Sequence, residues 1–410
     1  MGDVYTSVEL GTDTIKVVTV EKMGDIYNVL AATTCESKGI KNGQISDIKA
    51  AASSVSTAVE KVNQLLGIKI NKVIAAISPV ECKMDIVVGS TDIISETEIT
   101  GKDVSAVLKN AIEGHKAEGY EIITVSPISF MVDDIDNIKN PKGMRGTTLE
   151  AKVVISSIPK EKLYAVLDVI KQAGLKLIDV AFTSTGDYYT VRNKESDSSV
   201  GAIINIGESS TNISIFNKGI QIKHSIIPVG SVNVDKDLTY IYPISIKDAR
   251  SIKENFAFAL ESLTDEAESI NVKCTDNSIK ELKQAEVSEV VEARLKEILK
   301  LSKNEIKNLT NREIRYIIVT GGLSELQGFN YLLDSNFNGL AKVCEISNIG
   351  IRHNKYSSTF GVFMYFDEKL LLREKTYNMI DSKDKEILTS TENGLSNYGD
   401  FYNLYSCLFD

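Results

Sequence analysis

Histidine, cysteine and basic residues are scarce in this sequence, and each shortage disfavours a class of function. Only three of the 410 residues are histidine and no CxxC or HExxH pattern occurs, so a dedicated zinc site is not expected. The five cysteines stand far apart, which fits a reducing compartment better than a disulfide framework. Lysine plus arginine is 46 against 56 aspartate plus glutamate, and this net charge of -10 disfavours a nucleic-acid binder.

Long apolar runs are also missing. No stretch approaches the ~18–20 residues of a membrane span. Glu9, Asp13 and Lys16 interrupt the first strands and no basic segment precedes an apolar one, so a signal peptide is not expected. The apolar fraction of 43% and the charged fraction of 25% are ordinary for globular proteins. At ~100–200 residues per domain, the chain should hold two to four units and be cytosolic, at least up to its tail.

The chain contains an internal duplication. Residues 4–20 and 200–216 are largely alternating β-branched runs on either side of a small polar turn, with Gly11 and Gly207 in the same place. Each predicts two strands joined by a tight hairpin. In each half there follow a strand, a helix and a further strand, predicted at 27–33, 50–66 and 72–78 and at 219–228, 285–302 and 315–320. Two related α/β lobes facing a cleft are therefore expected.

The glycine turns favour a phosphate site. Glycine lets the backbone approach a ligand closely, and successive N–H groups form an anion-binding concavity. One such turn is most often an ordinary hairpin. A duplicated pair, together with Gly321–Gly322 after a buried strand, indicates a nucleotide clamped between two hairpins. The alternative interpretation of Gly321–Gly322 is a strand-to-helix turn that holds no ligand.

Several motifs in order, over about residues 5 to 370, carry a family resemblance. They are Glu9–Lys16, Ser37–Gly43 followed by Asp47–Ile48, Asn140–Met144, Ile227–Gly230, Ala249–Lys253 and Glu289–Arg294. The chain resembles the FtsA family of bacterial cell-division proteins, within the actin/Hsp70/sugar-kinase superfamily. The Asn-Pro-Lys-Gly-Met stretch at 140–144 separates it from Hsp70, actin and the sugar kinases.

The resemblance implies an α/β architecture with the actin-like ATPase fold, two ribonuclease-H-like lobes and an FtsA-type inserted subdomain. The expected boundaries are 1–81, 161–197 and 356–380 for the first lobe, 198–245 and 310–355 for the second, 82–160 for the inserted α/β subdomain, 246–309 for a small subdomain, and 381–410 for a flexible linker with a C-terminal amphipathic segment. Independently of the resemblance, apolar residues between 163 and 173 predict one amphipathic helix ending at Gly174.

The resemblance also implies a function. The chain should bind ATP and Mg2+ in the cleft, form filaments with itself, and tether FtsZ and other division proteins to the inner face of the cell membrane at the division site. FtsZ's C-terminal peptide is expected on 246–309, where Arg250, Lys296 and Lys300 are candidate contacts. Glu9 would organise Mg2+ and the attacking water. The nucleotide contacts carried over are Gly11, Thr12, Asp13, Lys16, Asn205, Gly207, Glu208, Ser209, Ser210, Lys253, Gly321, Gly322 and Ser324.

The departures from the family bear on hydrolysis. The family has aspartates at three positions where this chain has Glu9, Asn205 and Asn212. The two asparagines cannot act as general bases, because an amide does not accept a proton at neutral pH. Glu208 replaces a glycine, and a carboxylate ~4 Å from a bound phosphate costs on the order of 4 kcal/mol unless it turns away. Arg250 takes the place of the family's usual glutamate. We therefore expect ATP binding with at most a very weak ATPase, and Asn205→Asp should raise any residual rate.

The tail is a second informative region. Residues 381–400 are polar and read as a flexible linker. The resemblance implies a membrane-surface helix after it, although no basic residue follows Lys385 and both Asp400 and Asp410 are acidic. The usual attraction to anionic lipid, ~1 kcal/mol per basic residue, is therefore missing. Docking on the protein body or on a partner is the alternative. The residues on the expected apolar face are Phe401, Leu404, Tyr405 and Leu408.

Other functions stay open at this stage. A hydrolysing ATPase and a nucleotide-independent structural filament or adaptor with a degenerate ATP cleft are the main alternatives. A small-molecule kinase of the same superfamily would need a catalytic aspartate in the cleft, and none is evident. A pilus-type adaptor of similar fold would lack the Asn-Pro-Lys-Gly-Met stretch. Co-sedimentation with FtsZ, or filaments formed alone, would discriminate among them.

Overall fold

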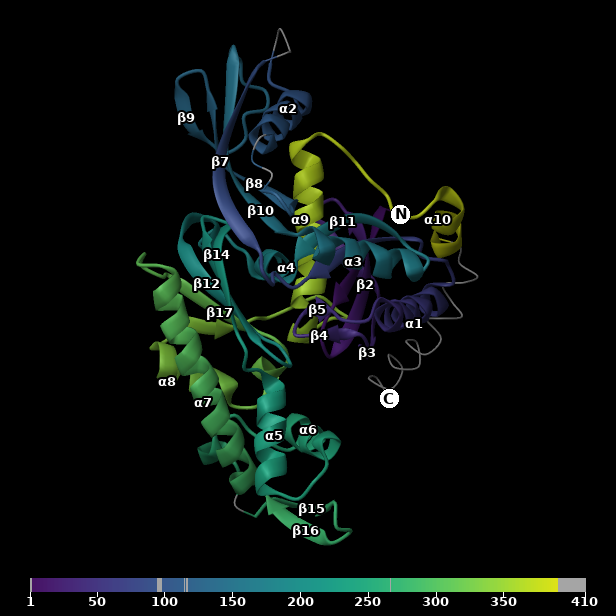
Figure 1. The fold of residues 1–410 in the computed structure, drawn as a ribbon, viewed down its shortest axis with the longest axis vertical. Helices are drawn as coiled ribbons and strands as arrows, with labels where there is room; N and C mark the ends of the chain where they lie inside the picture. The colour runs from purple at the N-terminus through teal and green to yellow at the C-terminus, as the bar shows by residue number, and fades with distance from the viewer. Residues whose placement is uncertain (1, 94–97, 114, 116, 266, 390–410) are drawn as a thin grey trace, which may run out of the picture. The chain divides into compact units, whose positions relative to one another are not determined.

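The computed structural model describes residues 2–93, 98–113, 115, 117–265 and 267–389, and the chain divides into two compact units. Unit 1 comprises residues 1–186, 347–351 and 358–410. Unit 2 comprises residues 187–346 and 352–357. The chain thus leaves unit 1 and returns to it more than once, as the colours of Figure 1 show.

Unit 1 is built on a five-stranded sheet of order β11–β6–β1–β2–β3. β1 pairs antiparallel with β2 and parallel with β6, and β6 pairs parallel with β11. Alternation along β1 places Val8 and Leu10 in an apolar cluster with the helices of one face, while Ser7 and Glu9 contact the helix on the other face. The strands are β1 (Asp3–Leu10), β2 (Thr14–Met23), β3 (Ile26–Glu36), β6 (Lys72–Ile77) and β11 (Lys176–Phe182).

Helices cover both faces of this sheet. α1 (Ile48–Leu66) begins at Asp47, whose side chain accepts the Ala50 N–H at 3.0 Å, and ends at Gly67 in the left-handed conformation. It packs with α3 (Lys160–Gln172) on one face. α9 (Ser357–Leu372) lies on the other, where the Ser7 hydroxyl donates to the Thr359 carbonyl at 2.6 Å. The helices predicted at 50–66 and 163–173 are confirmed.

A small hairpin and an inserted sheet complete unit 1. β4 (Ile40–Lys41) and β5 (Gln44–Ile45) meet at Asn42–Gly43, both with positive φ, as a two-residue type I′ turn requires. The insert is a sheet of order β7–β10–β8–β9 whose apolar face packs on α2 (Gly101–Ile112). Its strands are β7 (Lys83–Asp92), β8 (Tyr120–Val132), β9 (Ile135–Ile138) and β10 (Thr148–Pro159).

Unit 2 repeats the sheet of unit 1. Its order is β14–β13–β12–β17–β18, again an antiparallel meander of three strands followed by two parallel strands. The predicted duplication is therefore confirmed in topology. Gly11 and Gly207 follow the equivalent strands β1 and β12. The strands are β12 (Val200–Ile206), β13 (Thr211–Asn217), β14 (Ile220–Ile227), β17 (Tyr316–Thr320) and β18 (Ala341–Val343).

Four helices share one apolar core with this second sheet. The long α7 (Gln284–Leu309) contributes buried residues at helical spacing, including Val287, Val291, Leu295 and Ile298. The others are α5 (Ser231–Ile241), α6 (Ile246–Asn255) and α8 (Phe329–Phe337), and a hairpin of β15 (Ser269–Lys273) with β16 (Ile279–Lys283) joins α6 to α7.

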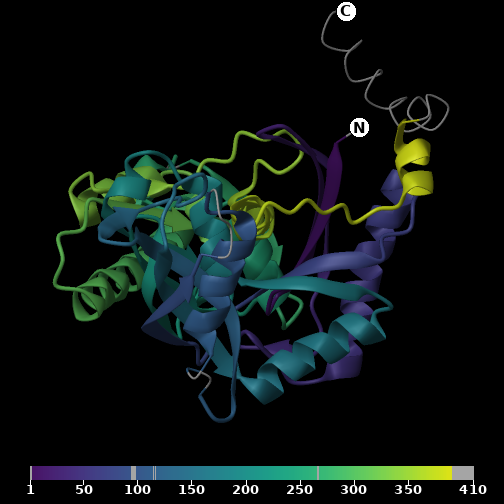
Figure 2. The ribbon, with the colours of Figure 1, turned by 90° about the horizontal axis from the view of Figure 1, so that it is seen from above.

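Two short helices connect or end the described chain. α4 (Thr183–Val191) carries the chain from unit 1 into unit 2. α10 (Ser382–Thr389) packs Ile387 and Leu388 against the core cluster of α1 and α3, and Figure 2 shows it near α1. Over the described residues, no helix combines the length and the apolar character that crossing a membrane requires.

Candidate functional site

The first glycine turn, between β1 and β2, is held by its neighbours. A Cβ on Gly11 would lie 2.4 Å from the Thr14 carbonyl oxygen, so the tight turn itself demands glycine. The Thr12 hydroxyl accepts the Gly43 N–H at 2.9 Å, and the Asp13 carbonyl accepts the Ser37 N–H at 2.8 Å. The tip of the β4–β5 hairpin thus fixes this turn in place.

Glu9, at the end of β1, is already fully engaged within unit 1. Its side chain is buried and forms an ion pair with Lys16, its cross-strand partner on β2. The other carboxylate oxygen accepts from the Ser358 hydroxyl at 3.0 Å and the Thr359 hydroxyl at 2.7 Å on α9. A carboxylate with three such partners has little capacity left to organise a hydrated cation.

The second glycine turn, Gly207–Ser210, is braced by the start of α5. The Gly207 N–H closes the turn onto the Ser210 carbonyl at 3.0 Å. The Gly207 and Glu208 carbonyls accept the Ser231 and Val232 N–H groups, each at 2.9 Å. Gly230 makes this approach possible, because a Cβ there would lie 2.4 Å from the Glu208 oxygen. Ser209 and Ser210 remain half-buried at the tip.

A network of four charges lies beside this turn. Arg250 on α6 places one nitrogen 2.8 Å from the Glu208 carboxylate and another 3.5 Å from Asp235. Lys253, one turn further along α6, lies 2.7 Å from Asp235, and both side chains are almost completely buried. The positive charge expected to meet a nucleotide at Lys253 is therefore directed to Asp235 within unit 2. The charge of Glu208 is balanced by Arg250.

Asn205, at the end of β12, belongs to a buried polar cluster. Its amide donates to Asp187 at 2.7 Å, and the second oxygen of Asp187 accepts the Ser357 hydroxyl at 2.5 Å. The Ser357 and Thr320 hydroxyls are 2.8 Å apart. Asp187 is only 1% exposed. Asn205 therefore faces a carboxylate that comes from α4, a residue that the sequence analysis did not single out.

Asn212 stands opposite Asn205 in the β12–β13 register. Its side-chain oxygen is buried and has no hydrogen-bond partner among the described residues. A buried acceptor in this position is costly unless a ligand or an ordered water satisfies it. Asn212 is therefore the polar group of the second hairpin that is best placed to serve something outside the protein.

The Gly321–Gly322 pair follows β17 and is shaped by β12. Gly321 has φ of 96°, and a Cβ on it would lie 2.2 Å from the Ile206 carbonyl oxygen. A Cβ on Gly322 would meet nothing within 4 Å, so this second glycine borders open space. Ser324 is buried; its hydroxyl donates to the Gly321 carbonyl at 2.7 Å and accepts from the Asn354 amide at 3.0 Å.

The structure thus groups the expected site residues into two sets. In unit 2, Gly207–Ser210, Gly321 and Gly322 converge on the end of β12, with Asn205 directly beneath them. In unit 1, Gly11–Asp13 sits at the end of β1 beside Glu9 and Lys16. Among the described residues, no group of three or more histidine, cysteine or acidic side chains is arranged to hold a metal ion. Phe401, Leu404, Tyr405 and Leu408 lie outside the described residues.

Sequence reasoning missed Asp187 and Asp235, and it gave Gly43 only as the end of a family motif. Asp187 had no signal, because a single aspartate among the polar residues of α4 looks like any surface residue. Asp235 could have been found as the acidic partner that a buried lysine requires. Gly43 had the clearest signal, since Asn-Gly between short strands predicts a type I′ hairpin.

Comparison with family models agrees with this architecture. Residues 202–361 match the model described as "Cell division protein FtsA", and residues 81–157 match "SHS2 domain inserted in FTSA". A cell division protein FtsA of Streptococcus pneumoniae is 28% identical over 361 residues, covering 86% of this chain and 78% of the relative. One of Bacillus subtilis is 25% identical over 394 residues, covering 95% and 90%.

Solved structures support the actin-like ATPase fold. MreB5 of Spiroplasma citri bound to ADP superposes with a TM-score of 0.56 at 12% identity, covering 90% of this chain and 98% of that one. A PilM–PilN type IV pilus biogenesis complex gives a TM-score of 0.61, also at 12% identity, over 88% of this chain and 98% of the other. At such identities the likeness concerns the fold alone.

Proposed function

Because the chain belongs to the FtsA family of cell-division proteins, we propose that it is an actin-like division scaffold that binds ATP with little or no hydrolysis. The observation that carries this proposal is that the duplicated glycine turns are both kept, while the acidic positions around them are neutralised. Glu9 is paired with Lys16, Asn205 donates to Asp187, and Glu208 is paired with Arg250. Backbone N–H groups can bind phosphate without any of these carboxylates. Hydrolysis, in contrast, needs a general base to activate the attacking water.

The residues present suit a triphosphate better than a magnesium ion. Gly322 borders open space and the Asn212 side-chain oxygen has no partner among the described residues, so the second hairpin retains room for a ligand and an acceptor for a hydroxyl or N–H group. When bound, the nucleotide would bring negative charge that the backbone N–H groups of the glycine turns would stabilise. A magnesium ion would find few ligands at these positions, because Glu9 already has three partners and the Asn205 amide donates to Asp187, which leaves the neutral Asn212 oxygen. No step is therefore assigned to the metal.

Two measurements test this proposal together. A fluorescent ATP analogue should bind the full chain, while phosphate release with Mg2+ should stay below ~0.1 per minute. Faster release would refute the low-turnover part. Absence of binding would favour the second candidate, a nucleotide-independent scaffold. That candidate draws support from Lys253, whose charge is directed to Asp235 rather than toward a ligand.

The small subdomain and the adjoining end of α5 offer a surface for an FtsZ-type peptide. Large apolar side chains are exposed on both: Ile246 and Ile279 (75% exposed) within 246–309, and Tyr240 (93% exposed) and Ile241 on α5. The β15–β16 hairpin is held against the end of α5, where the Thr275 N–H donates to the Pro243 carbonyl at 2.8 Å. Exposed lysines surround this patch at 236, 247 and 280. An acidic peptide with apolar side chains suits such a surface.

Co-sedimentation with FtsZ tests this surface. Tyr240→Ser combined with Ile279→Ser should abolish co-sedimentation. The matched control is Tyr331→Ser on α8, a tyrosine that is also exposed, at 65%, but lies outside the patch. Equal loss in both variants would contradict the proposed location. Two of the basic residues considered from the sequence contribute less, because Arg250 pairs with Glu208 and Lys296 pairs with Glu292.

Self-assembly and membrane attachment complete the proposal. We infer that the chain forms filaments, which electron microscopy with and without ATP would detect. The tail would attach it to the membrane surface through Phe401, Leu404, Tyr405 and Leu408. Liposome pelleting of the full chain against a variant truncated after Lys385 tests this attachment. Equal pelleting of the two proteins would refute the anchor.

A further inference from the structure

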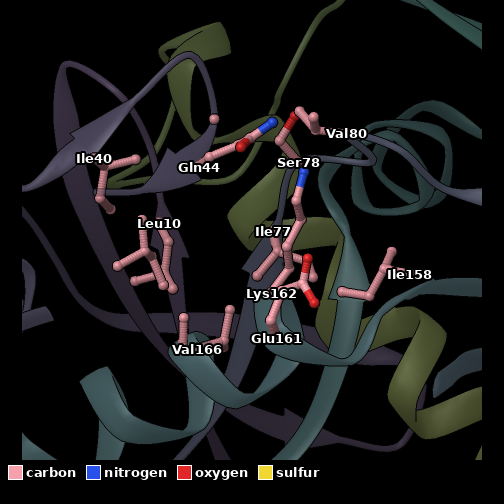
Figure 3. Close-up of a pocket in the computed structure, with 13 residues that line it drawn as sticks. Leu10, Ile40, Gln44, Ile77, Ser78, Val80, Ile158, Glu161, Lys162 and Val166 are labelled. Atoms are coloured by element: carbon pink, nitrogen blue, oxygen red, sulfur yellow. The ribbon is translucent and has the colours of Figure 1, made fainter. Parts of the chain in front are cut away.

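Unit 1 contains a cavity of about 300 Å³ on the α1/α3 side of its sheet (Figure 3). An engineered cavity of about 150 Å³ is already large enough for benzene, so this one has room for about two large apolar side chains. It lies just beyond the end of β1 and β6, next to the first glycine turn. Its lining is part polar and part apolar, and the apolar part includes Leu10, Ile40, Ile77, Ile158, Ala165 and Val166.

The rim of the cavity is polar and carries one lysine and one glutamate, Lys162 and Glu161. Figure 3 shows the Lys162 side chain running from α3 toward Gln44 and Ser78. Lys162 forms an ion pair with Glu81, and the Gln44 amide donates to the same carboxylate at 3.4 Å. Glu81 is more than half exposed, so this pairing is open to exchange for another carboxylate.

The cavity is connected to the glycine turn through the β4–β5 hairpin. Gly43, at the tip of that hairpin, lines the cavity and donates its N–H to the Thr12 hydroxyl. A Cβ on Gly43 would lie 2.8 Å from the Cβ of Ser78, so the tip is closely packed over the opening. An occupant of the cavity would therefore contact the element that fixes the turn.

The chain itself supplies a suitable occupant. The described part ends with α10, which packs Ile387 and Leu388 on the same apolar cluster that forms the cavity walls. Beyond it the sequence continues for 21 residues to position 410, and its apolar side chains recur at helical spacing from Phe401 to Leu408. The acidic tail adds no charge attraction, because Glu161 and Glu81 lie beside Lys162 on the rim, so the match rests on the apolar side chains and the short tether.

The tether is long enough to reach. Phe401 is 12 residues beyond Thr389, and an extended chain of that length spans up to about 40 Å. α1 has 19 residues and is therefore about 28 Å long, which is shorter than that span. The linker can thus reach the cavity from any point along α1.

We propose that the C-terminal segment, residues 401–408, docks its apolar side chains in this cavity of its own unit. The tether gives an effective concentration on the order of 1 mM, so an intrinsic Kd of about 0.1 mM leaves roughly 90% of the tails docked. A docked tail is withheld from lipid, and a tail on lipid leaves the cavity open beneath the glycine turn. This proposal requires neither ATP nor FtsZ; its liposome readout rests on the proposed membrane attachment, whereas the cross-linking readout tests docking alone.

A disulfide test in the full chain detects the docked state. The tail carries a natural cysteine at 407, and Gln44→Cys places a second thiol on the rim. Mild oxidation should join the two within one molecule, at least tenfold faster than in a control with Asp136→Cys on the exposed β9. Cys82 is a weak competitor, because burial raises the pKa of its thiol to about 12.

Two further variants decide the interpretation. Phe401→Ser with Leu408→Ser should remove the fast cross-link without touching the described fold. Ala165→Phe should fill the cavity, remove the cross-link and increase liposome pelleting severalfold, whereas Ala165→Ser should change neither. Cross-linking no faster than in the Asp136→Cys control, disulfides mainly between molecules, or a small molecule occupying the cavity in native mass spectrometry would each overturn the proposal.

Discussion

Replacing Asn205 by aspartate should destabilise unit 2 in a pH-dependent way. The new carboxylate would lie at the 2.7 Å contact that the amide now makes with Asp187, which is almost completely buried. Two carboxylates at that separation cannot both stay ionised, so one pKa must rise. A rise from 3.9 to about 7 costs roughly 1.4 kcal/mol per unit, or about 4 kcal/mol at pH 7.5.

The sign of the pH dependence follows from proton binding. The folded variant holds a proton that the unfolded chain has released, so its stability falls as pH rises. At pH 5 the penalty should shrink to about 1.5 kcal/mol, since only about one unit then separates the pH from the unfolded pKa. In thermal melts this corresponds to a drop in Tm of about 8–16 °C at pH 7.5 and about 3–6 °C at pH 5.

A double variant separates charge from shape. Asn205→Asp with Asp187→Asn restores one carboxylate and one amide, so its Tm should return to within about 3 °C of the natural protein at both pH values. The same variant moves the carboxylate to the hairpin, where phosphate release with ATP should increase if the family chemistry applies. An equal loss of Tm at pH 5 and 7.5 in the single variant would refute the reasoning.

Further predictions concern neighbouring charges. Glu208→Gln should tighten binding of an ATP analogue about tenfold, and Arg250→Gln should weaken binding by a similar factor, because each removes one screened charge near the ligand. Equal affinities of both variants and the natural protein in fluorescence titrations would contradict this prediction. Lys253→Met leaves a buried aspartate without its closest partner and should lower the unfolding free energy by about 3 kcal/mol, measured by denaturant midpoint. The Thr148 N–H and its neighbours hold the pKa of Asp133 at about 2. Because that pKa is lowered, the stabilisation that the Asp133 carboxylate provides is complete above about pH 4 and is lost as pH falls through 2. A pKa of Asp133 near 4, measured by NMR, would contradict this.

The fold was largely predictable because its signals are local. Alternating β-branched residues marked both hairpins, and helical spacing marked α1, α3 and α7. The duplication then predicted the common strand order, which β1–β2–β3 and β12–β13–β14 confirm. Residue type and spacing are enough to predict these elements, because each helix or strand buries one face and its apolar residues recur with the period of that face.

The partners of the site residues were not predictable in the same way. Glu208 and Arg250 are 42 positions apart, and each was noted as a departure from the family without any indication that they pair. Asp187 reaches Asn205 only because α4 packs against the end of β12. Such pairings depend on side-chain geometry after packing, which neither periodicity nor a motif encodes.

The charge pairs at the glycine turns also constrain how this protein can change. At positions 9, 205 and 208 the side chain has been matched by another residue elsewhere in the chain, through Lys16, Asp187 and Arg250 respectively. An aspartate introduced at 205 therefore meets Asp187, and a second substitution at 187 is needed to relieve the repulsion. An acidic group at this position thus requires two coordinated substitutions rather than one.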